Sequence, residues 1–405
     1  MKDTQISREQ FGALLWAGAL APVVELLPTI TLPVAGRGAW LSPLVAVAVL
    51  FPFFYKMDKL GGSVLTAREK LGKIFGTAFL IVYLGWLELL LTLRLGLCAR
   101  RMLVSGERDG SIWFFLLTLV ILCLWMGRGN PVAFARAGQI FLTVLVLVGV
   151  VVLLLSLPKT RIDWLLPLWK EDVPAVLGSG VPAAGVLFWS LLPMLCLRPA
   201  MEKGGKHLLW WGVGGCIALC AMQAILIGNL GAGLSGRTQN AFFALTKSVG
   251  VEGAFQRLES VVAALWLLAD LTLAVTILLA VRAICEELIP EFSPNLVVGG
   301  ALGIGLWGAW CWCFRGESME LWNRGWVPAG NLALGLGGTT LLYIGSTIGQ
   351  KIKGISIFRG RSGQKNGTSW GLKKDEKSRK KVLTNEKGSD NISKRSTVRH
   401  KSQAE

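Results

Sequence analysis

Residues 18–33 read Gly18-Ala-Leu-Ala-Pro22-Val-Val-Glu25-Leu-Leu-Pro28-Thr-Ile-Thr-Leu-Pro33. The stretch is apolar enough to enter a membrane, yet it holds three prolines and one glutamate. Each proline removes a backbone donor and clashes with the preceding turn of a helix. The stretch therefore predicts a helix that is broken near its middle. Irregular backbone at membrane depth is tolerated only where it is buried in protein or lines a cavity.

A second stretch of the same kind follows in the other half of the chain. Residues 178–193 read Gly178-Ser-Gly-Val-Pro182-Ala-Ala-Gly185-Val-Leu-Phe188-Trp189-Ser190-Leu-Leu-Pro193. Interrupted segments at corresponding positions of two halves are typical of transporters built from inverted repeats. The alternative is that both stretches are ordinary proline kinks in two unrelated helices.

The composition limits the class of protein. The 405-residue chain is 53% hydrophobic and only 17% charged, and it contains 17 tryptophans. Soluble proteins average about a quarter charged residues. A cytosolic enzyme, a disordered protein and a secreted disulfide-rich domain are therefore excluded, and a membrane protein with several spans remains.

About 20 apolar residues are needed to cross the hydrocarbon core of a bilayer. Ten segments meet or approach this length: 11–31, 39–55, 74–98, 112–126, 137–157, 181–197, 208–230, 261–285, 296–314 and 329–348. The predicted fold is an all-α integral membrane protein of about ten transmembrane helices, arranged as a five-plus-five inverted repeat with helices one and six broken. Repeat one covers about residues 9–157 and repeat two about residues 178–349, within a membrane domain of residues 1–350.

Residues 351–405 carry 16 Lys and Arg residues but only five Asp and Glu residues. This stretch has almost no aliphatic run, so it cannot bury enough surface to offset its ordering entropy. We expect a basic, disordered, cytoplasmic tail that sets the topology. Its first part, residues 351–361, is a candidate for contact with anionic lipid headgroups. Nucleic acid is not an expected partner, because few aromatic residues such as Trp370 are available for stacking.

Charges in the loops decide the orientation only weakly, since Lys and Arg are almost evenly divided between the two sides. The balance is tipped by the basic tail and by one loop with five positive residues, which are Lys56, Lys59, Arg68, Lys70 and Lys73. Cytoplasmic loops carry an excess of Lys and Arg. Both termini are therefore expected in the cytoplasm.

Three acidic residues, Glu25, Glu88 and Asp270, lie near the middle of predicted spans one, three and eight. A carboxylate at that depth is costly, so such groups usually face a cavity or a partner. The three are candidates for one central site of proton or polar coupling. The alternative is that each is neutral and hydrogen-bonded between helices. Arg94 turns away from the Glu88 face and is expected to extend toward the helix end, and Arg101 is expected in the loop that follows.

The chain has few residues of the kinds that bind metal ions or carry out catalysis. The two histidines lie at a loop edge and in the tail, and the eight cysteines fall in or at the edge of apolar spans. Such cysteines are expected to behave as small buried hydrophobic residues. No enzyme activity, metal site or cofactor is therefore predicted.

Two segments resemble those of a known family. Ala35-Gly36-Arg37-Gly38-Ala39-Trp40-Leu41-Ser42, which follows Pro28, resembles the first-to-second span signature of the GerAB-type spore germination permeases. Phe255-Gln256-Arg257-Leu258-Glu259-Ser260 resembles that family's entry into span eight. The resemblance extends over about residues 5–350. It implies the fold of the amino acid/polyamine/organocation superfamily, a five-plus-five inverted repeat with the substrate between spans one, three, six and eight.

The chain departs from this family in span one. Where the family has a Gly-x-Gly turn before the proline, this sequence has Ala21 and Val23, with Glu25 nearby. Small glycines let backbone amides approach a substrate carboxylate. Their absence, together with the added acid, disfavours an ordinary α-amino acid as the ligand.

The resemblance implies a ligand-sensing B subunit of a germinant receptor in the spore inner membrane, with A-type and lipoprotein C-type subunits as partners. The expected ligand is a small amino-acid-like nutrient in a central cavity formed by Ala21, Glu25, Gly185, Phe188 and Ser190. Glu25 is the candidate to pair with a ligand ammonium or to take up a proton. Two other functions stay open. One is a proton-coupled amino-acid or amine permease in which Glu25, Glu88 or Asp270 titrates, and the other is a scaffold that assembles the receptor without binding a ligand.

Overall fold

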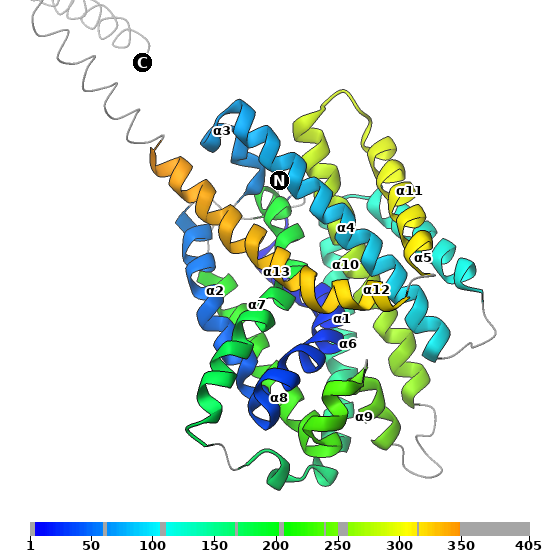
Figure 1. Ribbon diagram of the computed structural model, residues 1–405. Coiled ribbons are helices and arrows are strands. Elements are labelled where there is room, and N and C mark those ends of the chain that lie inside the picture. The colour runs from blue at the N-terminus through cyan, green and yellow to red at the C-terminus, as the bar shows by residue number, and fades with distance from the viewer. Residues whose placement is uncertain are drawn as a thin grey trace, which may run out of the picture. The chain divides into compact units, whose positions relative to one another are not determined.

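A computed structural model describes residues 5–59, 63–105, 111–166, 169–201, 206–238, 240–249, 258–313 and 316–348. These residues are almost wholly helical (Figure 1), because a lipid-exposed chain satisfies its backbone groups within each helix. Among them, the only β-pairing is an isolated bridge between Ile6 and Met201. The predicted all-α fold is confirmed. The predicted basic tail, residues 351–405, lies outside the described residues.

The long helices follow the predicted spans in order. They are α1 (Arg8–Ala35), α2 (Ser42–Lys59), α4 (Lys73–Ser105), α5 (Ile112–Gly127), α6 (Pro131–Ser156), α7 (Asp172–Leu197), α8 (Lys206–Arg237), α10 (Leu258–Leu288) and α11 (Pro294–Cys313). The last segment is composite, with α12 (Gly316–Leu321), the π-helical turn η7 (Trp322–Trp326), α13 (Val327–Leu332) and the π-helical turn η8 (Ala333–Gly338). Two short helices, α3 (Ala67–Leu71) and α9 (Ala241–Val249), lie between long ones.

Eight helical segments of the described residues are long and apolar enough to cross a membrane. The first of them, Arg8–Phe53, contains both α1 and α2, while α5 is apolar but only 16 residues long. Where the structure describes them, the ten predicted segments therefore lie in helical structure. The inverted-repeat relation between the two halves stays a prediction.

The prediction that helices one and six are broken is wrong. α1 runs as one helix of 28 residues through its three prolines, and α7 runs as one helix of 26 residues through two. α1 packs against α6, α7, α8 and α10, and such tertiary packing contributes more to helix stability than propensity does. The described helix with a non-helical residue inside it is α8, at Gly231, whose φ of 76° is a conformation that glycine adopts without strain.

The start of α1 is fixed by a capping box. Oγ of Ser7 accepts a hydrogen bond from the backbone of Gln10 at 3.2 Å, and the backbone of Ser7 donates to Oε1 of Gln10 at 3.0 Å. These contacts satisfy backbone donors that a helix leaves unpaired at its first turn. The cap therefore fixes the residue at which α1 begins.

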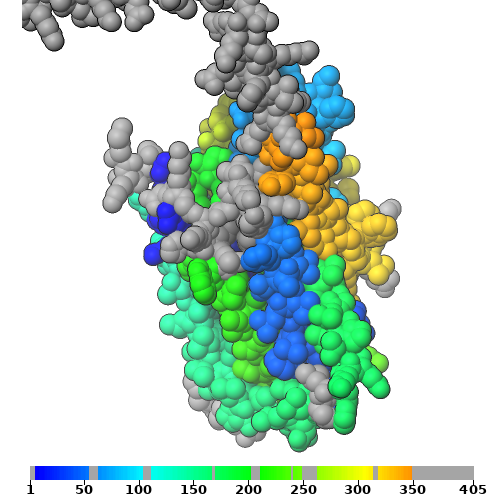
Figure 2. Space-filling view, turned by 90° about the vertical axis from the view of Figure 1, so that its left-hand side faces the viewer, coloured from blue at the N-terminus to red at the C-terminus, as the bar shows by residue number. Residues whose placement is uncertain are grey.

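Helix α1 occupies the interior of the bundle, with α4 and α10 on one side of it (Figure 1). α4 packs against α10 and α11, and α13 packs against α7. α2 packs against α7 and α8, and on the face shown in Figure 2 it lies beside η8. This arrangement brings α1, α4 and α10, which are distant in sequence, around one interior region.

Candidate functional site

Two arginines on α4 point into the helix bundle. Arg94 and Arg101 are seven residues apart, about two helical turns, so they share one face of α4. Their side chains are 1% and 4% exposed. Because a guanidinium group stays charged in proteins, burial at this depth requires anionic partners.

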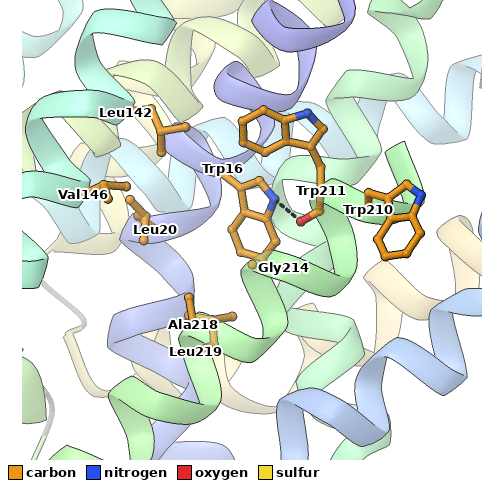
Figure 3. Close-up of a pocket in the computed structure, with 10 residues that line it drawn as sticks. Trp16, Leu20, Leu142, Val146, Trp210, Trp211, Gly214, Ala218 and Leu219 are labelled. Carbon is orange, nitrogen blue, oxygen red and sulfur yellow. Dashed lines mark hydrogen bonds between the residues drawn. The ribbon is translucent and has the colours of Figure 1, made fainter. Parts of the chain in front are cut away.

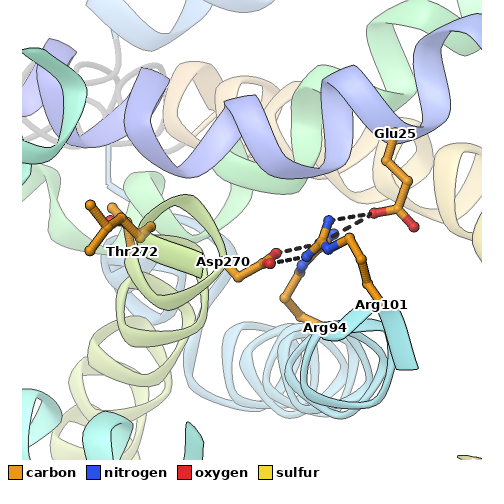
Figure 4. Close-up of polar contacts among 6 residues, drawn as sticks. Glu25, Arg94, Arg101, Asp270 and Thr272 are labelled. Carbon is orange, nitrogen blue, oxygen red and sulfur yellow. Dashed lines mark hydrogen bonds and ion pairs between the residues drawn. The ribbon is translucent and has the colours of Figure 1, made fainter. Parts of the chain in front are cut away.

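Glu25 on α1 and Asp270 on α10 supply the anions (Figure 4). Nη2 of Arg94 lies 3.2 Å from Oε2 of Glu25, and Nη1 of Arg101 lies 3.4 Å from the same oxygen. Both guanidinium groups also pair with the carboxylate of Asp270. We call Glu25, Arg94, Arg101 and Asp270 the charge network.

The charge network balances two cations against two anions. The Asp270 side chain is 1% exposed and that of Glu25 is 15% exposed. Desolvation offsets most of the attraction within a buried ion pair, yet removing one partner costs about 3–5 kcal/mol. We infer that the network contributes little net stability and instead fixes how α1, α4 and α10 are arranged.

A cavity of about 50 Å³ borders the charge network. Residues of α1, α4, α12 and η7, with one that precedes α9, line it: Glu25, Leu26, Thr29, Leu97, Arg100, Arg101, Asn240, Glu320, Asn323 and Arg324. We call this cavity the charged pocket. Within its lining, Nη1 of Arg100 lies 3.7 Å from Oε1 of Glu320, so an ion pair joins α4 to α12. Glu25 and Arg101 belong both to the pocket and to the network.

A larger cavity, of about 430 Å³, lies between α1, α6 and α8 (Figure 3). Its lining residues are Trp16, Leu20, Leu142, Val146, Trp210, Trp211, Gly214, Gly215, Ala218 and Leu219. Nε1 of Trp16 donates to the backbone oxygen of Trp211 at 3.0 Å. No charged side chain of the described residues lines this cavity, so it suits hydrocarbon better than a charged ligand. The charged pocket is therefore the candidate site.

Of the three acids expected to meet, the structure brings Glu25 and Asp270 together and leaves Glu88 apart. Oε1 of Glu88 is buried and has no hydrogen-bond partner among the described residues. A Cβ atom at Gly305 of α11 would lie 3.6 Å from this oxygen. The carboxyl group of Glu88 therefore lies where α4 contacts α11.

The other residues expected at the ligand are buried on α1 and α7, outside the lining of the charged pocket: Ala21, Gly185, Phe188 and Ser190. Gly185 permits a close approach of α7 to α13, because a Cβ there would clash with the carbonyl oxygen of Pro328. Phe188 packs edge-on against Phe53 of α2, with ring centroids 4.8 Å apart. The hydroxyl of Ser190 donates to a carbonyl oxygen of its own helix at 3.4 Å. The part of these residues in ligand binding stays a prediction.

The positions expected for Arg94 and Arg101 are wrong. Arg94 does not extend to the helix end, because Glu25 and Asp270 offer it partners in the interior. Arg101 lies in α4 rather than in the loop that follows, and it is buried. Two arginines at i and i+7 on a span, facing acids on two other spans, are the sequence signal that could have found the network.

The chemistry of the site is that of ionic and hydrogen-bonding recognition. Among the described residues, no group of three or more His, Cys, Asp and Glu side chains could hold a metal ion. The charged pocket instead offers guanidinium donors and carboxylate acceptors around one small cavity. Such a site suits a small molecule that carries both signs of charge.

Comparison with known proteins identifies the family to which the chain belongs. Residues 10–304 match the spore permease family, whose description is spore germination protein. The chain belongs to the spore germination protein family. The GerAB-type relation expected from the sequence is thereby confirmed, and the family is one of permeases rather than of enzymes.

This spore germination protein is similar to two solved transporter structures. One is the substrate-bound outward-open state of a Na+-coupled sialic acid symporter, with a TM-score of 0.57, 13% identity, and coverage of 82% of this chain and 79% of that chain. The other is MhsT in complex with L-phenylalanine, with a TM-score of 0.55, 16% identity, and coverage of 84% and 96%. No curated protein sequence matches the chain. At these identities the likeness shows the fold alone, so the spore germination protein is a multi-pass membrane protein with a transporter-like fold.

Proposed function

We propose that this protein is the ligand-sensing membrane subunit of a spore germinant receptor and that it binds a small, amino-acid-like nutrient in the charged pocket. The observation that carries the proposal is the double position of Glu25, which lines the pocket and also pairs with Arg94 and Arg101. A ligand that pairs with Glu25 competes with these arginines. Occupancy of the pocket therefore changes the charge network.

The lining of the pocket supports a zwitterionic ligand. Arg100, Arg101 and Arg324 offer hydrogen-bond donors, while Glu25 and Glu320 offer acceptors. A ligand ammonium can pair with a carboxylate, and a ligand carboxylate can form two parallel hydrogen bonds with a guanidinium fork. The arginines can thus take the role of the glycine amides that span one lacks. The cavity, of about 50 Å³, is much smaller than an ordinary ligand pocket of about 300–1,000 Å³, so only a very small nutrient fits unless the lining moves.

Binding becomes a signal only when the ligand prefers one of two arrangements of the protein. In the arrangement seen in the structure, the arginines of α4 link Glu25 of α1 to Asp270 of α10. When a ligand occupies Glu25, α1 loses this ionic link, while Asp270 still holds both arginines. We therefore expect α1 to move relative to α4 and α10, and a partner subunit to respond to that movement.

Membership of the family suggests which partner proteins respond to this movement and in which membrane. We propose that A-type and C-type receptor subunits are the partners, in the lipid of the spore inner membrane, with both termini of this chain in the cytoplasm. In that orientation α1 and α4 both run outward, and Glu25 and Arg101 lie in their second halves. The charged pocket then lies toward the side from which an external nutrient arrives.

A second candidate function, proton-coupled uptake of an amino acid or amine, is favoured by Glu88. Its Oε1 is buried without a hydrogen-bond partner among the described residues. An ionised carboxylate in such a place is costly, so Glu88 is a candidate to carry a proton during transport. The third candidate, a scaffold for the receptor, needs no ligand at all.

Reconstitution of the purified protein in liposomes separates these functions. Binding and uptake of radiolabelled amino acids are measured with and without an inward proton gradient. Saturable binding without flux supports the receptor. Sustained gradient-driven uptake that Glu88→Gln abolishes, and that the exposed control Glu286→Gln retains, supports the permease. Absence of both binding and uptake supports the scaffold and contradicts the other two.

A further inference from the structure

The π-helical turn η7 interrupts regular helix geometry in the last membrane segment. Single π-helical turns within α-helices occur frequently at functional sites. This turn has two distinct faces. Trp322 and Trp326 are 38% and 67% exposed, with ring centroids 6.1 Å apart. Asn323 is buried on the other face and lines the charged pocket.

The side chain of Asn323 lacks a partner for its acceptor. Asn323 is 2% exposed, and no described residue donates a hydrogen bond to its Oδ1. Asn331, eight residues later, is equally buried, but its Oδ1 accepts from Trp86 at 2.9 Å and its Nδ2 donates to the carbonyl oxygen of Gly185 at 3.1 Å. Buried polar groups are nearly always paired in proteins. The unpaired acceptor of Asn323 is therefore placed to receive a donor from a molecule in the pocket.

Asn323 is one of several acceptors that reach the pocket from different elements. Glu320 and Asn323 are three residues apart, at the spacing that puts two side chains on one helix face. Glu25 reaches the same cavity from α1. A donor group bound there can meet a carboxylate from one element and a neutral amide oxygen from another.

The number of donors on the ligand decides whether both acceptors are satisfied. An ammonium group has three N–H donors, while a hydroxyl group has one. An ammonium can donate to Glu25 and to Asn323 at the same time, but a hydroxyl can donate to only one of them. If it donates to Glu25 in place of the arginines, Oδ1 of Asn323 stays unpaired, and if it donates to Asn323, Glu25 stays paired with the arginines and does not bind the ligand. Sites built to hydrogen-bond a particular group strongly reject analogues that leave such groups unpaired.

We propose that Oδ1 of Asn323 accepts a hydrogen bond from the ammonium group of the nutrient and thereby selects amino acids against the corresponding hydroxy acids. The ligand class is a small zwitterion with a primary ammonium group. This proposal rests on the proposed function, since it requires the nutrient to lie in the charged pocket. It adds a specificity-determining residue on the last membrane segment, far in sequence from Glu25.

The test measures binding of matched compounds to the full-length protein in lipid nanodiscs. The pairs are glycine and glycolate, alanine and lactate, and serine and glycerate. The wild-type protein should bind at least one amino acid more tightly than its hydroxy-acid counterpart. Asn323→Leu, which removes the acceptor at similar size, should weaken binding of that amino acid by about tenfold or more and binding of the hydroxy acid by less than about threefold. Asn295→Leu, at an exposed position of α11, is the control and should bind like the wild type.

Two results would overturn the proposal. Equal weakening of both compounds in Asn323→Leu assigns the residue a structural role, and unchanged binding of the amino acid removes it from the site. Where Asn323→Leu does not fold, Asn323→Ala decides, because it removes the same acceptor with a smaller side chain and should weaken binding of the amino acid selectively. An unchanged preference for the amino acid in Asn323→Ala contradicts the proposal. Failure of the wild-type protein to bind any of the six compounds is a different result, since it contradicts the proposed function without any variant.

Discussion

Asp270 on α10 and Arg101 on α4 form an ion pair across 169 positions of sequence. Both side chains are almost fully buried, and Arg94 pairs with the same carboxylate. The pair fixes one register between two helices that would otherwise contact through interchangeable apolar side chains. Glu25 of α1 completes the network, so a change in its pairing alters the contacts that join α1, α4 and α10.

Asp270→Leu should destabilise the protein strongly. The substitution leaves Arg94 and Arg101 with Glu25 as the remaining anion of the network, so one positive charge is buried without a partner. Breaking a buried pair in this way costs about 3–5 kcal/mol. The prediction is checked by thermal unfolding in detergent, followed by tryptophan fluorescence, and by the amount of folded protein in the membrane.

A second variant and a control show whether charge is the cause. Asp270→Leu combined with Arg101→Met restores charge balance and should recover much of the lost stability, since an apolar pair can replace a buried ion pair. Glu286→Gln removes an exposed i,i+4 pair with Arg282 and should change stability by less than about 1 kcal/mol. Asp270→Leu with wild-type stability would contradict the energetic role of the network.

The apolar segments were predictable because hydropathy reports directly on burial in a membrane, and the predicted segments lie in helical structure where the structure describes them. The depth of Glu25 and Asp270 was readable for the same reason. The pairing of Arg94 and Arg101 with these acids was not, since the sequence shows two arginines on one face of α4 but not which helices pack against that face. Their anions come from α1 and α10, and only the packing of three helices brings these groups within 3.2–3.4 Å of one another at Glu25.

The proline pattern misled prediction in α1 and α7 for a related reason. A proline breaks a helix that must stabilise itself, but α1 is held by four neighbouring helices. The interruption occurs instead at Gly231 of α8, where the sequence has no proline. The sequence also could not show that the acceptor of Asn323 is unpaired. Asn331 is an asparagine on the same segment, yet both its amide oxygen and its amide nitrogen have hydrogen-bond partners.

Reporter fusions should place both termini in the cytoplasm. Alkaline phosphatase folds only where its disulfides can form, which is outside the cytoplasm. Fused after Glu405 it should be inactive, while a fluorescent protein at the same position should fluoresce. Fused after Asp163, between α6 and α7, alkaline phosphatase should be active. The reverse pattern would invert the topology and put the charged pocket toward the cytoplasm.

Gly185→Ala should destabilise the contact between α7 and α13. A Cβ at this position meets the backbone of Pro328, which cannot move as a side chain can. Overpacking of this kind costs about 1–3 kcal/mol. Gly178 is the control, because it lies on the same helix at an exposed position and a Cβ there would meet no atom within 4 Å. Gly178→Ala should therefore be neutral or stabilising by up to about 1 kcal/mol. Equal unfolding temperatures for the two variants would show that the close approach of α7 to α13 is not required. If Gly185→Ala instead has normal stability but an altered nutrient response, Gly185 lies at the ligand.

Glu25→Gln should shift the nutrient response. The protein should stay in the membrane, although loss of the ion pairs with Arg94 and Arg101 should lower its stability. Glutamine keeps the size of the side chain and its ability to hydrogen-bond, but it removes the charge that pairs with a ligand ammonium. Hydrogen bonds to charged groups contribute about 1.5–3 kcal/mol, so the nutrient concentration for half-maximal germination should rise about tenfold or more. The measurement is the fall in optical density of spores over a range of nutrient concentrations, with membrane levels of the variant determined in parallel.

Glu9→Gln is the matched control for this experiment, because Glu9 lies on the same helix but is exposed in its first turn. It should give the wild-type response curve. The two variants make the same chemical change on α1, so a difference between them reports on the position of Glu25 rather than on the charge of the helix. An unchanged response curve in Glu25→Gln, at normal membrane levels, would remove Glu25 from the ligand site, and with it the link between the pocket and the charge network.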